Sequence, residues 1–286
     1  MDKYTMKDFD KEFKDDASCL EWVKNHRWPD GVHCDTCNKI TKHHRVTGRS
    51  CYACDYCGHQ VYPLADTIFR KSSTPLRTWF HAIFLMASTR CGISAKQLQR
   101  ETGVTYKTAW RMFKQIRTLF DEDMDKFSGD VEADETYVGA RKAGLRGRGA
   151  AGKTIVAGVV ERKGGITTKI VTDVKAKTLI PLVVDSVASG STIYTDDMPS
   201  YQNLSKIGYN HKTIKHMTKV FIDGDIHTGT IDGFWSLVKR GITGVYHSVS
   251  PKYLQHYVDE YAFRYNHRKD EKAMFKIVLG RIVSQS

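Results

Sequence analysis

The chain has 286 residues, of which 41% are hydrophobic and 27% are charged, as in a soluble globular protein with room for two or three domains. Its 44 Lys and Arg residues exceed its 32 Asp and Glu residues, so the net charge is +12 and the pI is about 9.3. This balance favours a polyanionic partner, most commonly nucleic acid, and nothing in the sequence favours a small-molecule substrate. Because no apolar run is near the roughly 18 residues of a membrane span and the first residues are mostly charged, we expect a cytoplasmic protein without a membrane partner.

Seven cysteines in a chain of this kind indicate metal binding rather than a disulfide framework. Four of them form two close pairs, Cys34 with Cys37 and Cys54 with Cys57. This Cys-x2-Cys-x16-Cys-x2-Cys spacing is typical of a zinc ribbon, in which a structural Zn²⁺ has four thiolate ligands and no open position. Asn38 and Gly58 follow the pairs and tolerate the positive φ of a metal-binding knuckle. A Cys51/Cys54 second pair stays open as an alternative, although Asp55 would then follow the knuckle.

Residues 1–70 are assigned to a helical lead-in and the zinc ribbon, and residues 71–127 to a helical region that binds DNA. An apolar helix at 74–88 precedes a helix, a turn at Gly103 and a second helix, which together form a helix-turn-helix over 92–117. The second helix has an apolar stripe at helical spacing, made of Ala109, Phe113, Ile116 and Phe120. On another face, DNA contacts are predicted for Lys107, Arg111 and Lys114. A solvated helix in an all-α bundle is the alternative.

From residue 128 onward the pattern changes from helical to alternating, and residues 128–286 are assigned to one α/β domain. Its strands and helices are expected, in chain order, at 130–139, 154–162 and 166–174 (strands), 176–190 (helix), 191–197 (strand), 200–208 (helix) and 210–216 (strand). Further helices follow, one of them starting at Ser250 and Pro251. This order predicts an RNase-H-like fold with a mixed sheet as the catalytic domain.

A glycine-rich loop, residues 140–153, separates the first two strands of this domain. It contains five basic residues and no acidic ones. A basic, flexible loop beside a sheet suits a phosphate backbone, so Arg146, Arg148 and Lys153 are predicted to bind DNA. A plain solvated loop is the alternative.

Three carboxylates far apart in the sequence fit a site for two divalent metal ions. Asp134 lies in the first strand of the domain, Asp196 ends the fourth, and Asp232 opens a helix that follows the sheet. Phosphoryl transfer on DNA uses such ions, and Mg²⁺ prefers carboxylate oxygens. Each acid has neighbours that compete for the role, namely Glu132, Glu135, Asp197, Asp223 and Asp225. Strand alternation places Glu132 on the same face as Asp134 and Glu135 on the opposite face.

Over nearly its whole length the chain resembles the ISXO-like insertion-sequence transposases, bacterial members of the DDE superfamily. The resemblance is carried by eight stretches in this order: RWPDGVHCDTC, CDYCGHQVYPLADTIF, GISAKQLQRETGVTYKTAWRM, VEADETYVG, GRGAAGKT, IYTDD, GDIHTGTIDGFWSLVKRG and YHSVSPKYLQHYVDEYAFRYNHR. It implies that Asp134 and Asp196 bind catalytic Mg²⁺ or Mn²⁺ ions, two in all, with Asp232 at the third acidic position. Lys239 belongs to the family's site signature and is expected to touch the DNA end, and the adjacent Arg240 is also assigned to DNA binding.

The third acidic position departs from the family pattern. Relatives have HTN or HTH followed by IEGFW, whereas this chain has Gly229 in place of the Asn or His and Asp232 in place of the Glu. The Asp side chain is one methylene shorter, and Gly229 supplies no ligand. Asp232 can still reach a metal directly or through a water, because Mg²⁺ usually keeps several waters. A decayed or altered copy is the alternative.

The resemblance implies a transposase that cleaves the ends of its element and joins the freed 3′-hydroxyl groups to target DNA. The zinc ribbon and helix-turn-helix would recognise the terminal inverted repeats, and a homodimer or larger assembly on DNA is implied because two ends must meet. Two alternatives stay open. One is a catalytically weakened remnant that binds specific DNA as a repressor, and the other is a nuclease that cleaves without joining.

Overall fold

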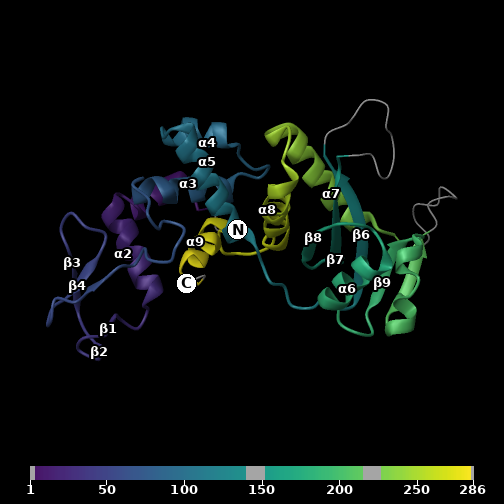
Figure 1. The fold of residues 1–286 in the computed structure, drawn as a ribbon, viewed down its shortest axis with the longest axis horizontal. Helices are drawn as coiled ribbons and strands as arrows, with labels where there is room; N and C mark the ends of the chain where they lie inside the picture. Colours follow the sequence, from purple (N-terminus) through teal and green to yellow (C-terminus); the bar gives the residue numbers. More distant parts are fainter. Residues whose placement is uncertain (1–3, 140–151, 215–226, 285–286) are drawn as a thin grey trace. The chain divides into compact units, whose positions relative to one another are not determined.

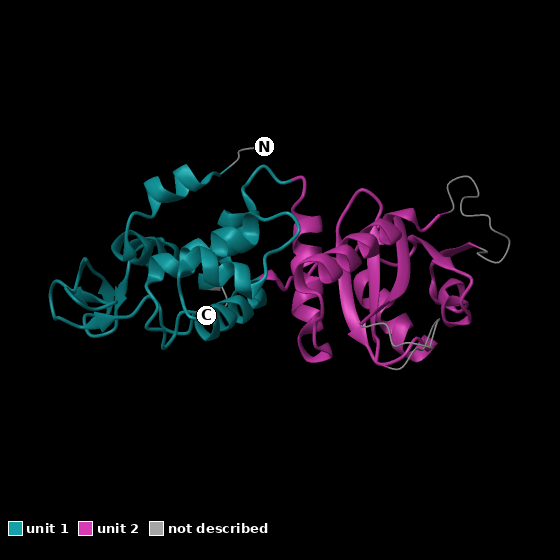
Figure 2. Ribbon diagram, turned by 90° about the horizontal axis from the view of Figure 1, so that it is seen from above, with its two compact units in different colours: residues 1–119, 270–286 teal, residues 120–269 magenta. Residues whose placement is uncertain are grey.

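A computed structural model describes residues 4–139, 152–214 and 227–284 of the chain (Figure 1). Its contacts divide the chain into two compact units, Met1–Leu119 with Asp270–Ser286 and Phe120–Lys269 (Figure 2). Among the described residues, no helix combines the length and the apolar character that crossing a membrane requires.

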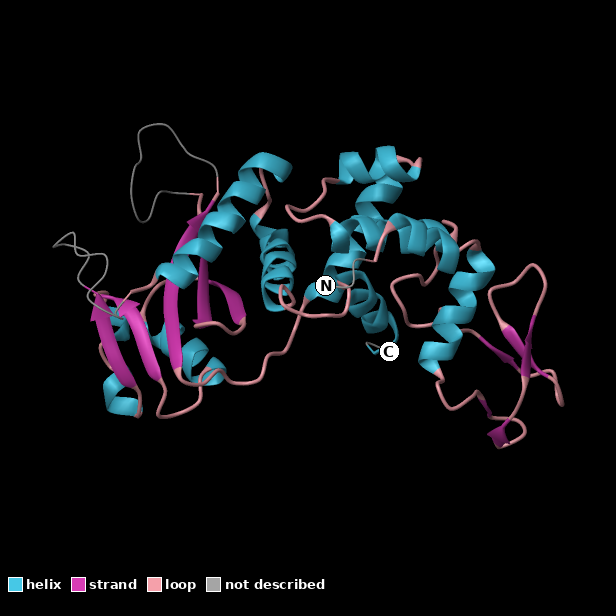
Figure 3. Ribbon diagram, turned by 180° about the vertical axis from the view of Figure 1, so that it is seen from behind, coloured by secondary structure: helices cyan, strands magenta, loops and turns pink. Residues whose placement is uncertain are grey.

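The first unit combines a group of helices with two small sheets (Figure 3). Its helices are α1 (Met6–Glu12), α2 (Asp16–Arg27), α3 (Leu76–Ser88), α4 (Ala95–Thr102), α5 (Tyr106–Arg117) and α9 (Met274–Ser284). Its strands are β1 (His33–Cys34), β2 (Lys39–Ile40), β3 (His43–Arg45), β4 (Tyr52–Cys54) and β5 (Gln60–Val61). β1 pairs with β2, and the other three form an antiparallel sheet in the order β3-β4-β5.

The C-terminal helix α9 belongs to the first unit, because an aromatic cluster holds it there. The ring of Phe275 lies 5.9 Å from that of Phe9, 6.0 Å from that of Phe13 and 5.5 Å from that of Phe84. Burying such a ring stabilises the contact by about 2–3 kcal/mol. The sequence reading groups α9 with the catalytic domain, whereas contact clustering groups it with the N-terminal helices. The predicted domain boundaries at 1–70, 71–127 and 128–286 stay predictions.

Helices α4 and α5 form the expected helix-turn-helix. The Ser94 hydroxyl caps α4 by accepting from the N–H of Gln97 at 3.1 Å, and Gly103 ends that helix with a φ of +68°. Thr105 caps α5 by accepting from the N–H of Thr108 at 3.3 Å. The apolar stripe is buried, and the three basic residues assigned to DNA, Lys107, Arg111 and Lys114, are exposed. These three side chains are therefore accessible at the surface, and that of Arg111 also donates to the carbonyl of Arg70 at 3.1 Å.

The second unit is built on one five-stranded mixed sheet. Its strands are β6 (Asp130–Val138), β7 (Thr154–Glu161), β8 (Ile166–Val171), β9 (Thr192–Asp196) and β10 (Asn210–Ile214), in the spatial order β10-β9-β6-β7-β8. β7 runs antiparallel to both of its neighbours, whereas β9 runs parallel to β6 and to β10. Three antiparallel strands followed by two parallel ones form the RNase-H-like sheet, so the predicted fold class is confirmed.

Helices cover both faces of this sheet. They are α6 (Ala176–Ser186), α7 (Gly229–Gly241) and α8 (Leu254–Asn266), and a π-helical turn, Ile242–Tyr246, continues α7. Alternation along β7 explains the two layers, since Ala157 and Val159 pack in the same core as α6 while Val156 and Val160 pack with α7 and α8. The α7 helix therefore lies on the face to which the even-numbered residues of β6 also point, since Val138 packs against it and Glu132 and Asp134 accept from it.

Candidate active site

Three acids from three separate elements line one cleft. Asp134 comes from β6, Asp196 is the last residue of β9, and Asp232 lies in the first turn of α7. The cleft has a volume of about 560 Å³. Its other lining residues are Glu135, Thr136, Thr228, Trp235, Ser236, Lys239 and Arg240. The parallel pairing of β6 with β9 and the packing of α7 on the sheet bring these distant residues together.

The three acids are not equally close. Carboxylate oxygens of Asp134, Glu135 and Asp196 lie within 4.8 Å of one another, as the ligands of a metal ion do, and Asp232 is outside that group. Alternation along β6 predicts that Glu135 points to the face opposite Asp134, yet Glu135 also lines the cleft, and its Oε2 accepts from the hydroxyl of buried Tyr201 at 3.3 Å. The structure thus keeps Glu135 open as a ligand candidate and places Asp232 further away in the same cleft.

Asp134 is held by a tryptophan of α7. The indole N–H of Trp235 donates to Oδ2 of Asp134 at 3.0 Å. Across the sheet, Asp134 is the register partner of Gly158 on β7, and a Cβ at Gly158 would lie 2.8 Å from the Trp235 ring. The missing side chain at Gly158 therefore makes room for the indole that orients the carboxylate.

The pKa of the Asp134 carboxyl is raised from its usual 3.8 to about 6, chiefly because the group is buried. The charges of Asp232 and Asp196 contribute to this rise, whereas hydrogen bonds from the backbone and from Trp235 act in the opposite direction. Repulsion among these carboxylates at one cleft is the electrostatic signature of a site that a divalent cation would stabilise.

The structure separates two pairs of competing acids. Asp196 is buried, and its Oδ1 accepts from the N–H of Met198 at 3.1 Å, whereas Asp197 is exposed and does not line the cleft. Glu132 shares a strand face with Asp134 but is fully buried and accepts from the backbone of α7. Asp223 and Asp225 lie outside the described residues.

A second cluster, in the first unit, has the chemistry of a zinc site. Sulfur atoms of Cys34, Cys37, Cys54 and Cys57 all lie within 4.8 Å of one another, with Cys34 and Cys57 at 3.4 Å and Cys37 and Cys54 at 3.9 Å. Zn–S bonds of about 2.3 Å in a tetrahedron place sulfurs about 3.8 Å apart. The thiol of Cys51 instead donates to Gln60 at 3.6 Å, so the structure favours Cys57 over the Cys51 alternative.

The Thr41 hydroxyl supports this cluster from outside. It lies 3.2 Å from Sγ of Cys54 and, together with backbone N–H groups of Cys57 and Tyr56, lowers the pKa of that thiol to about 6. A thiol that ionises readily is the form that binds zinc.

Comparison with known proteins identifies both units. Residues 126–266 match the ISXO2-like transposase domain, and residues 14–60 match the transposase zinc-ribbon domain. The chain belongs to the ISXO2-like transposases. The zinc-ribbon match and the four clustered cysteines together support a structural Zn²⁺ in this transposase.

Two relatives carry the same resemblance. An uncharacterized protein in transposable element ISH50 of Halobacterium salinarum is 28% identical over 291 residues, covering 94% of this chain and 97% of the relative. An uncharacterized transposase-like protein of Haemophilus influenzae is 28% identical over 121 residues, covering 41% of this chain and 97% of the relative.

Solved structures of two other systems align with this transposase at low similarity. A simian T-cell lymphotropic virus intasome in complex with a regulatory subunit aligns with a TM-score of 0.31 and 13% identity, over 63% of this chain and 65% of that one. A pre-cleavage Mos1 transpososome aligns with a TM-score of 0.29 and 12% identity, over 72% of this chain and 77% of that one. The strand order, not these alignments, assigns the fold.

The sequence patterns of this transposase did not indicate the contacts that Trp235 and Glu132 make in the structure. The motif alone does not indicate that Trp235 contacts an acid of the cleft. The available signal is that Trp235 follows Asp232 by one helical turn on an apolar helix face. For Glu132 the sequence indicates a candidate metal ligand and not the cap of α7. Of the loop residues assigned to DNA, Arg146 and Arg148 lie outside the described residues, and Lys153 is half-buried just before β7.

Proposed function

We propose that this transposase cleaves the ends of its insertion sequence and joins the freed 3′-hydroxyl groups to target DNA. One observation carries the proposal. Asp134, Asp196 and Asp232 line the same cleft as two cations on α7, Lys239 and Arg240. Acids that hold metals and cations that hold phosphate are the two components that phosphoryl transfer on DNA requires.

The carboxylates of Asp134, Asp196 and Asp232 would hold two Mg²⁺ or Mn²⁺ ions. When bound, the ions supply an activated attacking oxygen and neutralise charge on the leaving oxygen. Trp235 fixes the Asp134 carboxylate from one side, and the Met198 N–H fixes that of Asp196. Because cleavage and joining use the same site, no covalent protein intermediate is needed.

The DNA would be held by several separate surfaces. Lys239 and Arg240 are both exposed and lie at the cleft, where the backbone of a DNA end would pass the acids. The helix-turn-helix, through Lys107, Arg111 and Lys114, and the zinc ribbon would bind the terminal inverted repeats. Since two ends must be joined in one reaction, the active form would be a homodimer or a larger assembly on DNA.

A nicking assay tests this proposal. Purified protein with its own element ends and Mg²⁺ or Mn²⁺ is expected to nick at the 3′ ends and join them to target DNA. Asp134→Ala should abolish both steps by at least about a thousandfold while end binding remains, because it removes a metal ligand. The matched control is Asp197→Ala, an exposed acid next to the site, which should act like the unaltered chain. Loss of activity in both variants, or in neither, would contradict the assignment.

The alternative function is a sequence-specific repressor with a weakened site. The position of Asp232 favours the repressor, since this acid lies outside the group of carboxylates that approach one another within 4.8 Å. End binding without nicking by the unaltered chain would support the repressor. The double variant Gly229→Asn with Asp232→Glu lengthens the acid and supplies a further ligand. The site can accept the new side chain, since among the described residues a Cβ at Gly229 would have Nδ1 of His227 as its neighbour within 4 Å, at 3.4 Å. Activity gained by this double variant would show that the site has decayed.

A further inference from the structure

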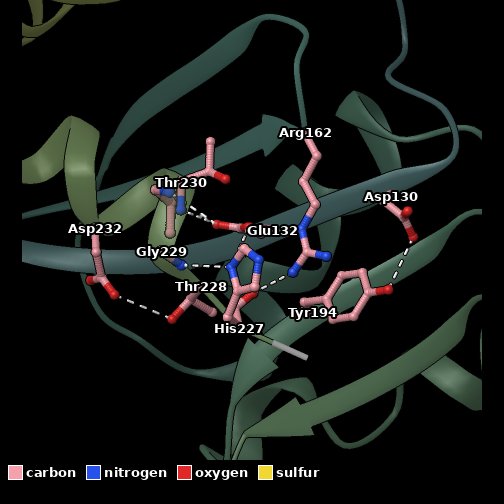
Figure 4. A network of polar contacts seen from close by, with 10 residues as sticks. Asp130, Glu132, Arg162, Tyr194, His227, Thr228, Gly229, Thr230 and Asp232 are labelled. Carbon is pink, nitrogen blue, oxygen red and sulfur yellow. Dashed lines mark hydrogen bonds and ion pairs between the residues drawn. The ribbon is translucent and has the colours of Figure 1, made fainter. Parts of the chain in front are cut away.

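The N-terminus of α7, the helix that carries Asp232, is capped by a side chain of strand β6. Thr228 stands at the N-cap of α7 but makes no side-chain cap bond to the backbone. The N–H groups of Thr230 and Ile231 donate instead to Oε2 of Glu132 on β6, at 2.9 and 3.0 Å (Figure 4). A helix start leaves such N–H groups without partners, and a carboxylate there also interacts favourably with the helix dipole. Glu132 therefore ties the start of α7 to β6.

Arg162, just after β7, completes a network around that carboxylate. Its Nε donates to Oε1 of Glu132 at 2.9 Å, and a terminal nitrogen donates to the carbonyl of His227 at 2.6 Å. Its guanidinium lies over the ring of Tyr194, 3.9 Å from the centroid. The Tyr194 hydroxyl in turn donates to Oδ1 of Asp130 at 3.1 Å. Figure 4 shows these side chains gathered beside the start of α7.

Each element that carries an acid of the site also contributes a member of this network. The pairs are Glu132 and Asp134 on β6, Tyr194 and Asp196 on β9, and Thr230 and Asp232 in the first turn of α7. On both strands the network member stands two residues before the acid, and so on the same strand face. The Thr228 hydroxyl donates to Oδ2 of Asp232 at 3.3 Å. One connected set of contacts thus fixes all three elements relative to one another.

We propose that Glu132 and Arg162 are positioning residues that hold the start of α7, and with it Asp232, at the cleft that Asp134 and Asp196 also line. The inference rests on the proposed function, because it assumes a metal site in the cleft. It matters most for the third acid, whose short side chain leaves little reach to absorb a displaced helix. Glu132 is fully buried and Arg162 is 15% exposed, so water cannot replace either partner well. Loss of the Glu132–Arg162 ion pair would displace the start of α7 and weaken metal binding by Asp232.

The test is Mn²⁺ binding to the zinc-loaded full chain, measured by calorimetry without DNA. Glu132→Gln keeps the shape and an acceptor for the α7 backbone, but turns an amide toward the Arg162 N–H. We expect its Mn²⁺ affinity to fall by about 10- to 100-fold, as for other residues that orient metal ligands. Asp232→Asn should cause a loss of similar size. If Glu132 acts through Asp232, the double variant should bind Mn²⁺ no more weakly than Asp232→Asn alone.

Glu260→Gln is the matched control for lost stability. Glu260 on α8 is also fully buried and accepts from a terminal nitrogen of Arg264 at 2.6 Å, so the variant disrupts a comparable ion pair in the same unit. Glu260 is not among the residues that line the cleft, and α8 carries none of the three acids. We expect it to lower the Tm about as much as Glu132→Gln and to leave Mn²⁺ affinity unchanged.

Three outcomes would overturn the inference, and they are distinguishable. If Asp134→Asn abolishes Mn²⁺ binding but Glu132→Gln binds like the unaltered chain, the positioning role fails while the metal site stands. If the folded, unaltered chain binds no Mn²⁺ in the cleft, the proposed function fails and the positioning role fails with it. Equal weakening by Glu260→Gln would also count against positioning, because it would show a general effect of destabilisation.

Discussion

Replacing the buried carboxylate at position 134 should stabilise the metal-free protein, in a way that depends on pH. The pKa of Asp134 in the folded protein is about 6, against 3.8 for an exposed aspartate. The folded state therefore binds this proton more tightly than the unfolded state. As pH rises from about 4 to about 6, ionisation costs the folded state free energy, and above pH 6 the full cost is present.

The size of the effect follows from the two pKa values. A change from 3.8 to about 6 corresponds to about 3 kcal/mol of unfolding free energy. For a unit of this size that amounts to roughly 6–12 °C in Tm. Asp134→Asn removes the ionisation while its amide oxygen can still accept from the Trp235 indole. We expect the variant to be more stable than the unaltered chain by this amount at pH 8 and about equally stable at pH 4.

Thermal unfolding of zinc-loaded protein at both pH values, without Mg²⁺ or Mn²⁺, measures this difference. Asp197→Asn, at the exposed neighbour, should show no difference at either pH. Adding Mn²⁺ should raise the Tm of the unaltered chain and not that of Asp134→Asn, since only the former keeps the ligand. A stabilisation of equal size at pH 4 and pH 8, or none at either, would refute the inference that burial raises the pKa of the Asp134 carboxyl.

Three further outcomes follow from the structure. Cys57→Ser should lose the structural zinc and Cys51→Ser should keep it, as measured by zinc released per chain; retention by the first together with loss by the second would restore the Cys51 alternative. Gly158→Ala should push the Trp235 ring away from Asp134 and lower the nicking rate by about tenfold without changing affinity for element ends; weaker end binding would point instead to misfolding. Lys239→Ala should weaken end binding and reduce the slope of log affinity against log salt by about one, read by titration at several salt concentrations, whereas an unchanged slope would place this lysine away from phosphate.

Much of the fold was readable from local patterns. The spacing of the cysteine pairs predicted the zinc ribbon, and the family match confirmed that ribbon. Alternation along β6 predicted that Glu132 and Asp134 share a strand face, and both contact α7. Helical spacing placed Asp232 and Lys239 on one face of α7, and both line the cleft. The order of strands and helices was enough for the RNase-H-like fold. The catalytic roles themselves stay predictions.

What the sequence by itself determined was which side each residue faces within its own element, since periods of two and 3.6 residues are local properties of the backbone. It did not determine which distant residues meet. Only tertiary packing decided that Glu132 caps α7 instead of joining the acids, that Cys57 and not Cys51 joins the sulfur cluster, and that α9 packs with the N-terminal helices. Those outcomes depend on strand pairing and on buried contacts between segments up to hundreds of residues apart, and no local pattern encodes such contacts.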